Sequence, residues 1–407
     1  MALVIHKYGG TSVADADRIR NVAKRVVDAV KSGDEVVAVV SAMGQQTDEL
    51  VALAAEVSQQ SHPREMDMLL TAGERVAMAL VAMAIEDLGV AATSLTGSQA
   101  GILTTGTHGR AEIVEIRANR VREGLDEGRV VIVAGFQGVD PTSKEITTLG
   151  RGGSDATAVA LAAALKADRC EIFTDVDGVY TADPKIVPRA VKLSEVTFSE
   201  MLELASAGAG VLMPRAVEFG RRFSIPIHVR SSFHDGAGTW IKEETMEQPV
   251  VRGITHDESE AKLTVFGVPD TPGVAASVFE PLADAGINVD MIVQNVSHDG
   301  TTDISFTVPM SMVDVALREV AAAVEAVGAG GVSVDSEIAK VTVVGIGMKT
   351  ESGIASQIFR ILADHDINIQ MISTSPIRIS CVVEGERVAD AVMALHTGLG
   401  LDGDDSS

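Results

Sequence analysis

The C-terminal part of the chain contains an internal repeat, and this repeat constrains the fold more than any other feature of the sequence. KLTVFG at 262–267 corresponds to KVTVVG at 340–345, 78 residues later. Beyond a loop the offset becomes 80, where LADAGIN at 282–288 matches LADHDIN at 362–368. A match of this length and spacing predicts two copies of one small folding unit.

Each copy has the order strand, glycine-bearing loop, helix, strand, strand, helix over about seventy residues, which is typical of a ferredoxin-like βαββαβ sandwich. Two copies are too few for a solenoid. We therefore expect the pair to pack on each other, with their matching loops at a shared interface. A platform that serves only for dimerisation is the alternative.

The N-terminal part, about 230 residues, alternates short apolar runs with longer amphipathic ones. This alternation predicts an α/β domain in which strands of a mainly parallel sheet are joined by crossover helices. The expected strands are 2–7, 35–41, 130–134, 171–174 and 225–229, and the expected helices are 14–31, 66–88, 113–127, 155–165 and 199–207.

The alternation stops near 231–261, where SSFHDGAGT and the charged run KEETME indicate a linker. We expect a first domain at 1–245, a linker with a strand leading into the repeats at 246–261, a first repeat domain at 262–335, and a second at 336–407 that ends in a short acidic tail.

Charge and composition exclude several classes of protein. With Lys+Arg 33 and Asp+Glu 57 the net charge is −24, which argues against a protein that coats nucleic acid. The two cysteines, Cys170 and Cys381, are too few for a disulfide framework and fit a reducing cytoplasm. The N-terminus does not read as a signal peptide, and the apolar stretch at 156–165 is too short to span a bilayer. We expect a cytoplasmic protein that binds neither nucleic acid nor membrane.

A glycine-rich segment, KYGGTSV at 7–13, lies where the first expected strand turns into a helix. Its two glycines allow a ligand to approach the backbone, and free N–H groups at a helix start favour a phosphate. Lys7 would add a positive charge. A capped turn with a surface lysine is the alternative.

A second glycine turn, TLGRGGSD at 148–155, leads into the Ala-rich helix. Arg151 lies between glycines, where a guanidinium suits a carboxylate or a phosphate. Ser154 or Asp155 could instead cap the helix. A third segment, 174–185, follows a strand and could hold a nucleotide, or form a loop with an Asp-Pro turn.

Other patterns carry no function. GLGLDG at 398–403 fits the dinucleotide motif but precedes no helix. No P-loop or HExxH motif occurs and the nine histidines are scattered, so we predict no protein-bound metal cluster.

Taken together, these segments resemble the aspartate kinase family of the wider amino-acid-kinase group. VSAMG at 40–44 and LTAGE at 70–74 match two further family segments, and the repeats resemble tandem ACT domains, which bind amino-acid effectors. The similarity spans nearly the whole chain and is closest to the actinobacterial type.

The resemblance implies transfer of the ATP γ-phosphoryl group to the β-carboxylate of L-aspartate, giving 4-phospho-L-aspartate for lysine, threonine and methionine biosynthesis. Lys7 would stabilise the transferring phosphoryl group, and Asp155 would orient Lys7. Arg151 would hold an aspartate carboxylate and Glu74 the α-ammonium. Mg²⁺ would arrive on the phosphates.

The resemblance also assigns the remaining contacts of the site. For aspartate these are Ser41, Thr47, Gly152, Gly153 and Ser154, and for ATP they are Tyr8, Gly9, Gly10, Thr174, Asp175, Tyr180, Asp183 and Lys185. For threonine and lysine, expected as concerted inhibitors, they are Asp270, Gly273, Val274, Asn288, Gln294, Ile354, Asn368, Ile369 and Ser375.

Some features depart from the family pattern. Gly210 stands where relatives have a nucleotide-contacting lysine, for which Arg215 or Lys185 would compensate, and the loop 352–355 lacks the usual proline. The alternatives are a catalytically silent amino-acid sensor and a kinase for another carboxylate. We expect a homo-oligomer, or a tetramer with a regulatory subunit that starts at Met246.

Overall fold

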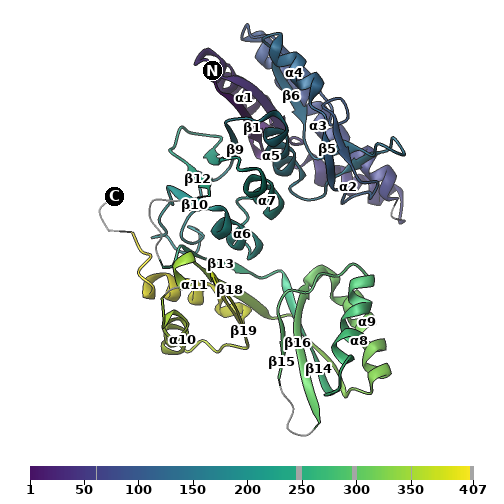
Figure 1. Cartoon of the computed structure of the whole chain (residues 1–407), viewed down its shortest axis with the longest axis vertical. Helices are drawn as coiled ribbons and strands as arrows, with labels where there is room; N and C mark the ends of the chain where they lie inside the picture. Colours follow the sequence, from purple (N-terminus) through teal and green to yellow (C-terminus); the bar gives the residue numbers. More distant parts are fainter. Residues whose placement is uncertain (61, 244–249, 296–299, 350, 404–407) are drawn as a thin grey trace. The chain divides into compact units, whose positions relative to one another are not determined.

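The computed structural model describes residues 1–60, 62–243, 250–295, 300–349 and 351–403. The chain divides into two compact units (Figure 1). The first unit comprises Met1–Val179, Lys192–Ser206 and Gly210–Glu247, and the second comprises Tyr180–Val191, Ala207–Ala209 and Gln248–Ser407.

The first unit is built on an eight-stranded sheet of order β10-β12-β11-β9-β1-β2-β6-β3. All neighbouring strands in it are parallel except β11 and β12. Parallel strands buried on both faces read as continuous apolar runs, which is why the sequence revealed the central strands. The strands are β1 (Leu3–Tyr8), β2 (Glu35–Val40), β3 (Ala92–Leu95), β6 (Val130–Ala134), β9 (Arg169–Thr174), β10 (Glu195–Thr197), β11 (Ile227–Ser231) and β12 (Thr239–Lys242).

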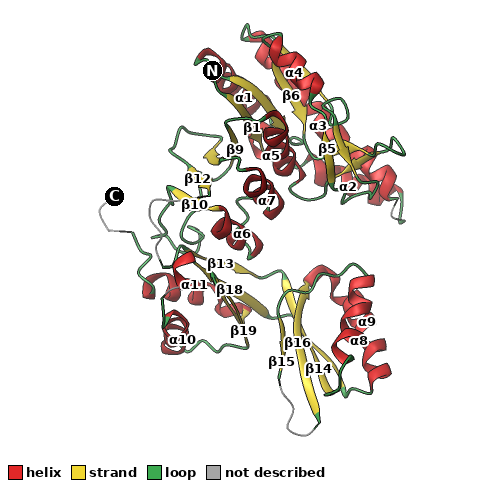
Figure 2. Ribbon diagram, in the orientation of Figure 1, coloured by secondary structure: helices red, strands yellow, loops and turns green. Residues whose placement is uncertain are grey.

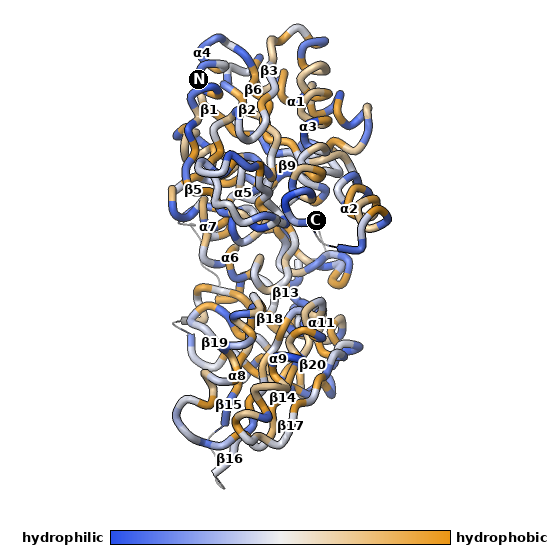
Figure 3. The backbone as a smooth tube through the Cα atoms, turned by 90° about the vertical axis from the view of Figure 1, so that its right-hand side faces the viewer, coloured by the Kyte–Doolittle hydropathy of each residue, from blue (hydrophilic) through white to orange (hydrophobic). Residues whose placement is uncertain are grey.

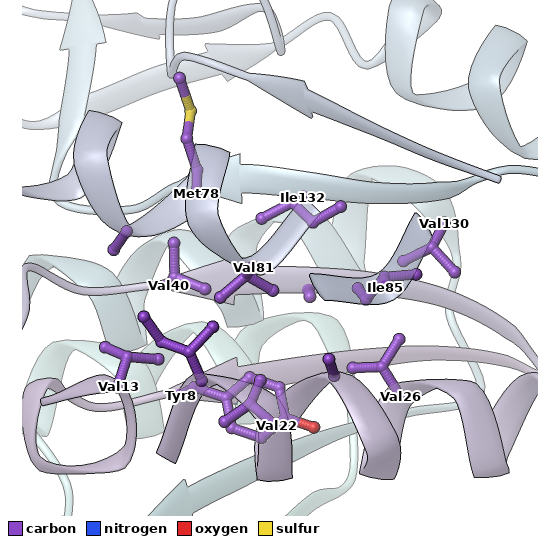
Figure 4. Packing of buried hydrophobic residues seen from close by; sticks show 14 of the residues in the cluster. Tyr8, Val13, Val22, Val26, Val40, Met78, Val81, Ile85, Val130 and Ile132 are labelled. Atoms are coloured by element: carbon purple, nitrogen blue, oxygen red, sulfur yellow. The ribbon is translucent and has the colours of Figure 1, made fainter. Parts of the chain in front are cut away.

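Helices cover both faces of this sheet. On one face, α1 and α3 enclose a core with β1, β2 and β6, and Figure 4 shows Tyr8, Val22, Val81 and Ile132 packed together there. On the other face, α5 packs against β1 and β9. The helices are α1 (Ala16–Lys31), α2 (Gln46–Val57), α3 (Pro63–Asp87), α4 (Asn119–Asp126), α5 (Gly153–Leu165), α6 (Phe198–Ser206) and α7 (Pro214–Phe223).

The long helix α3 is apolar enough to cross a membrane by length and composition alone. In this fold, however, Ala77, Val81 and Ile85 are buried in the core shared with α1 and the sheet. The apolar character of α3 therefore fits the role of a core helix.

A second, smaller sheet of order β5-β4-β7-β8 lies in the same unit. It contains β4 (Ile102–Thr104), β5 (Ile113–Ile116), β7 (Gln137–Val139) and β8 (Ile146–Thr148). The expected helix at 113–127 is therefore wrong over its first part, because β-branched residues there pair with β4 and only Asn119–Asp126 is helical.

The second unit contains the two repeats, each a four-stranded antiparallel sheet with two helices side by side (Figure 2). The first sheet has the order β15-β16-β14-β17 and the second β13-β18-β20-β19, so the fourth strand of the second repeat comes from before the first. The first repeat comprises β14 (Glu260–Pro269), α8 (Val274–Asp284), β15 (Ile292–Gln294), β16 (Thr301–Pro309), α9 (Val313–Val327) and β17 (Gly331–Asp335). The second comprises β13 (Gly253–Asp257), β18 (Ile338–Val344), α10 (Ile354–Asp364), β19 (Met371–Ser375), β20 (Arg378–Glu384) and α11 (Val388–Gly398).

The two repeats contact each other through equivalent residues, as the sequence predicts. Lys340 of the second repeat lies 2.5 Å from Asp290 of the first, and Lys262 of the first donates to Gln370 of the second. Met291 and Met371 share a small buried cluster. Because these contacts are exchanged, the repeats are related by an approximate two-fold axis.

One segment of the second unit comes from between β9 and β10 in the sequence. Ala182 and Val187 are buried in the core of the second repeat. The hydroxyl of Thr181 lies 2.8 Å from Nε2 of the buried His396 in α11. Residues 180–191 thus contribute to the core of the second unit.

Figure 3 shows how hydrophilic and hydrophobic stretches alternate along the chain in both units.

We predict that Ile85→Ala lowers the free energy of unfolding of the first unit by about 2–5 kcal/mol, because Ile85 is fully buried and its truncation leaves a cavity. Met83→Ala is the matched control, since Met83 lies on the same helix and is 59% exposed. Its effect should stay within about 0.5 kcal/mol. Denaturant titration measures both, and equal effects would contradict the packing of α3.

Candidate active site

Lys7 lies at the end of β1 and points to the face of the sheet that α5 covers. Its Nζ is 2.6 Å from Oδ1 of Asp155, in the first turn of α5, and both side chains are about nine-tenths buried. Neighbouring residues of a strand face opposite sides, so Tyr8 lies in the core under α1 and stacks on Phe173. The contact expected between Lys7 and Asp155 is present.

The glycine turn after β1 lies against the segment that follows β2. The N–H of Gly44 donates to the carbonyl of Gly10 at 3.0 Å. A Cβ at Gly10 would lie 2.9 Å from the carbonyl oxygen of Ala42, so only glycine fits there. The N–H of Ser41 donates to the carbonyl of Tyr8. Two motifs distant in the sequence are therefore adjacent.

Glu74 on α3 reaches the same place. Its Oε1 accepts from the N–H of Ala42 at 3.3 Å, while its buried Oε2 has no hydrogen-bond partner in the described part of the chain. Burial raises the pKa of Glu74 to about 7. A buried carboxylate with one open oxygen is suited to a cationic ligand.

The turn before α5 depends on two glycines with positive φ, Gly150 (75°) and Gly152 (70°). A Cβ at Gly152 would lie 1.8 Å from Cγ of Met213. Gly152 is the N-cap of α5 and no side chain caps the helix, so the capping interpretation of Ser154 and Asp155 is wrong. Gly153, Ser154 and Asp155 are buried at the start of the helix.

Arg151 is exposed in this turn. Across the described residues, its guanidinium takes part in no hydrogen bond or ion pair. It follows Gly150 directly, and its turn leads into the helix that carries Asp155. An unpaired arginine in the turn that leads to the partner of Lys7 gives the first unit a place for an anionic ligand.

The remaining predicted contacts lie in different places. Thr47 is half-buried in the first turn of α2. Thr174 ends β9 and Asp175 follows it, beside the end of β1, where the N–H of Gly9 donates to the carbonyl of Phe173. Tyr180, Asp183 and Lys185 belong to the second unit. There Asp183 accepts from the N–H of Lys185 at 2.9 Å, as an Asp-Pro turn would.

Two pairs of predicted effector positions, Val274 with Ile354 and Asn288 with Asn368, occupy equivalent places in the two repeats. Gly273 and Gly353 precede α8 and α10 with φ of 97° and 96°, and Val274 and Ile354 begin these helices. The other positions lie in loops or short strands of the same sheets. Asn288, Gln294, Asn368 and Asp270 are exposed, and Ile369 and Ser375 are half-buried.

Two polar residues near the turn at 148–152 escaped the sequence analysis: Asp67 and His108. Arg215, which the sequence analysis considered only as a replacement for the lysine missing at Gly210, also contacts this turn. Arg215 donates to the carbonyls of Leu149 and Ala111 at 3.3 and 3.1 Å, so its guanidinium holds this turn. The only sequence signal for Asp67 was an acidic residue within an apolar helix.

A Cβ placed on Gly210 would meet no other atom within 4 Å. Among the described residues no group of three metal-ligating side chains occurs.

Comparison with known proteins identifies one family in the N-terminal part of the chain and another in the two repeats. A model of the amino acid kinase family matches residues 2–231, and an ACT domain model matches 263–324 and 341–399. An aspartokinase of Mycolicibacterium smegmatis is 55% identical over 413 residues, which cover 100% of this chain and 98% of the relative.

Solved structures of Escherichia coli aspartokinase III are similar over 98% of this chain and 99% of theirs. The complex with aspartate and ADP, described as the R-state, has a TM-score of 0.83 at 28% identity. The complex with lysine and aspartate, described as the T-state, has a TM-score of 0.76 at 29% identity. These findings confirm the resemblance seen in the motifs: the chain belongs to the amino acid kinase family and, within it, to the aspartokinases.

Proposed function

We propose that the residues around Lys7 and Glu74 transfer the γ-phosphoryl group of ATP to the β-carboxylate of L-aspartate. The observation that carries this proposal is the buried Lys7–Asp155 pair in the same unit as the open oxygen of Glu74. The Lys7 side chain suits the negative charge that develops on the phosphoryl group, and the Glu74 carboxylate suits an ammonium. Aspartate offers both an ammonium and a carboxylate nucleophile.

Lys7 stabilises the negative charge of the transferring phosphoryl group. Such transfers pass through a loose transition state, which positioning and fixed cations stabilise. Asp155 holds the ammonium of Lys7 in place at 2.6 Å. The β-carboxylate of aspartate is ionised at neutral pH, so the reaction requires no general base.

Arg151 and Glu74 bind the two ends of aspartate. Arg151 receives a carboxylate, because its guanidinium is exposed and unpaired within the described residues. Glu74 receives the α-ammonium on Oε2. The remaining hydrogen bonds come from residues on neighbouring loops and helix starts: Ser41, Thr47, Gly152, Gly153 and Ser154.

ATP enters as its magnesium complex, with the metal carried by the phosphates. The main-chain N–H of Gly10 faces the phosphates, whereas Gly9, whose N–H donates to Phe173, lets the phosphates approach its main chain. Tyr8 contributes through its main chain, because its side chain is buried in the core. Thr174 and Asp175 belong to the proposed nucleotide segment, to which the family resemblance also assigns Tyr180, Asp183 and Lys185. Gly210 leaves open the space that a lysine fills in relatives.

The ACT repeats make the enzyme subject to feedback by threonine and lysine. The support is the equivalent geometry of the Gly273 and Gly353 loops, together with the lysine complex of the E. coli relative. We keep the domain bounds proposed from the sequence: the kinase domain at 1–245, the linker at 246–261, and the two ACT domains at 262–335 and 336–407. We also propose that the protein forms an oligomer and is located in the cytoplasm. Met246, the proposed internal start, lies outside the described residues.

The direct test measures aspartyl hydroxamate formed by the pure protein with ATP, Mg²⁺ and hydroxylamine. We expect a signal that depends on aspartate and is much weaker with glutamate. An absent signal together with calorimetric binding of threonine or lysine, but not ATP, would favour the silent sensor suggested by Gly210. A stronger signal with glutamate would favour another acceptor.

We predict that Lys7→Ala lowers kcat by about a hundredfold or more, because one fixed cation on a transition-state charge contributes on this scale. Lys24→Ala is the control, since Lys24 is an exposed lysine on α1. The hydroxamate assay at saturating ATP and aspartate measures both. Near-normal turnover of the Lys7 variant would remove Lys7 from the mechanism.

The pKa of Glu74, about 7, predicts a pH dependence. Below this pH the carboxylate is protonated and cannot pair with the ammonium. We therefore expect kcat/KM for aspartate to fall by about tenfold per pH unit well below pH 7. Glu74→Gln should lower kcat/KM at pH 8 and flatten the profile. An unchanged inflection in this variant would assign the titration to another group.

A further inference from the structure

Asp67 is a fully buried carboxylate on α3, at 1% exposure. Its Oδ1 accepts from the hydroxyl of Thr148 at 2.5 Å and from the N–H of Gly109 at 3.1 Å. Its Oδ2 lies 2.6 Å from Nδ1 of His108. Burying a carboxylate is unfavourable unless hydrogen-bond partners surround it. Asp67 is therefore stable in this place only together with its three partners.

These partners all lie beside the turn at 148–152, which carries Arg151. Thr148 ends β8, three residues before Arg151. His108 and Gly109 lie in the loop between β4 and β5, and that loop contacts the turn directly. The N–H of Ala111 donates to the carbonyl of Thr148 at 2.8 Å, and a Cβ at Gly150 would lie 3.0 Å from the carbonyl oxygen of Gly109. Asp67 therefore joins α3 to both segments that hold Arg151.

Arg215 completes the support from α7. Its guanidinium donates to the carbonyl of Leu149 and to that of Ala111. Residues 148 and 149 thus receive one side-chain contact from α3 and one from α7. The main chain that leads into Arg151 is fixed on two sides.

The same helix carries Glu74, seven residues after Asp67. Seven residues are about two turns, or about 10 Å along the axis, so both carboxylates lie on one face. Both are buried, and Thr71 between them accepts from Nε2 of Gln137 through its carbonyl. One rigid element therefore carries the ammonium-binding carboxylate and the anchor of the guanidinium turn.

We propose that Asp67 is a positioning residue that fixes the spacing between Glu74 and Arg151, so that α3 measures the length of the amino-acid substrate. The inference rests on the proposed function, in which these two residues bind the two ends of aspartate. A fixed spacing accepts aspartate and places the longer glutamate out of reach of the phosphoryl group. Loosening the anchor relaxes this selection, because small displacements of reacting groups have large effects on rate.

The test is steady-state kinetics of Asp67→Asn in the full chain, with both aspartate and glutamate. Asparagine keeps the shape but directs an NH₂ group at a donor. We expect the KM for aspartate to rise by about tenfold and the preference for aspartate over glutamate to fall by a similar factor. The KM for ATP should stay within about twofold.

Thr148 provides a second pair of variants that does not alter the buried charge. Thr148→Val removes the hydroxyl and should reproduce the kinetic pattern of Asp67→Asn, whereas Thr148→Ser keeps the hydroxyl and should retain wild-type selectivity. The Asp67→Asn/Thr148→Val double variant should be no more impaired than Asp67→Asn alone, since Asp67→Asn already disrupts the interaction that Thr148→Val removes. If Asp67→Asn does not fold, the selectivity of Thr148→Val compared with that of Thr148→Ser tests the inference.

Glu200→Gln is the control for destabilisation alone, because Glu200 is a buried carboxylate of the same unit that accepts from the N–H and hydroxyl of Thr197. Its KM for aspartate should be unchanged. A folded Asp67→Asn variant with wild-type selectivity would overturn the inference. Equal changes in the KM for aspartate and the KM for ATP would also overturn it. An inactive wild-type protein would instead overturn the proposed function, and the inference with it.

Discussion

The arrangement of the first unit depends on one buried ion pair, Lys7 with Asp155. A lysine at the end of a central strand is tolerated only with a partner, and α5 supplies it from its first turn. The pair holds the cation on the face of β1 that α5 covers. The opposite face, with Tyr8, is then free to form the core under α1 and α3. Core packing and the position of the cation thus follow from the same strand.

The sequence was informative where the determinants are local. The apolar runs predicted the central strands, and the glycine turns predicted the positions of Lys7 and Arg151. The helix expected at 113–127 was wrong because pairing with β4, not local pattern, decides residues 113–116. The bond between Asp67 and Thr148 joins residues 81 positions apart, and only the fold brings them together. The resemblance located Glu74, but its open oxygen and raised pKa required burial to be known.

Glu74 illustrates how a binding group opposes stability. Its folded pKa, about 7, is above the ordinary 4.5. The folded state therefore binds the proton more tightly, and this favours folding below the ordinary pKa. Between these two values the contribution is lost as the pH rises. The ionised form that suits an ammonium is thus the form that the fold tolerates least, and substrate binding would offset that cost.

The segment 180–191 limits how this protein can be divided. It lies in sequence within the kinase part, yet Ala182 and Val187 are buried in the core of the second repeat, and Thr181 contacts His396. A gene fragment that ends before the repeats would encode these apolar residues without their cover. A fragment that begins at the repeats would leave the matching surface of the second repeat uncovered. The two halves are therefore poor modules for recombination, and a separate chain that contains only the repeats, such as the proposed subunit starting at Met246, would need the segment 180–191 of a full-length chain to complete its core.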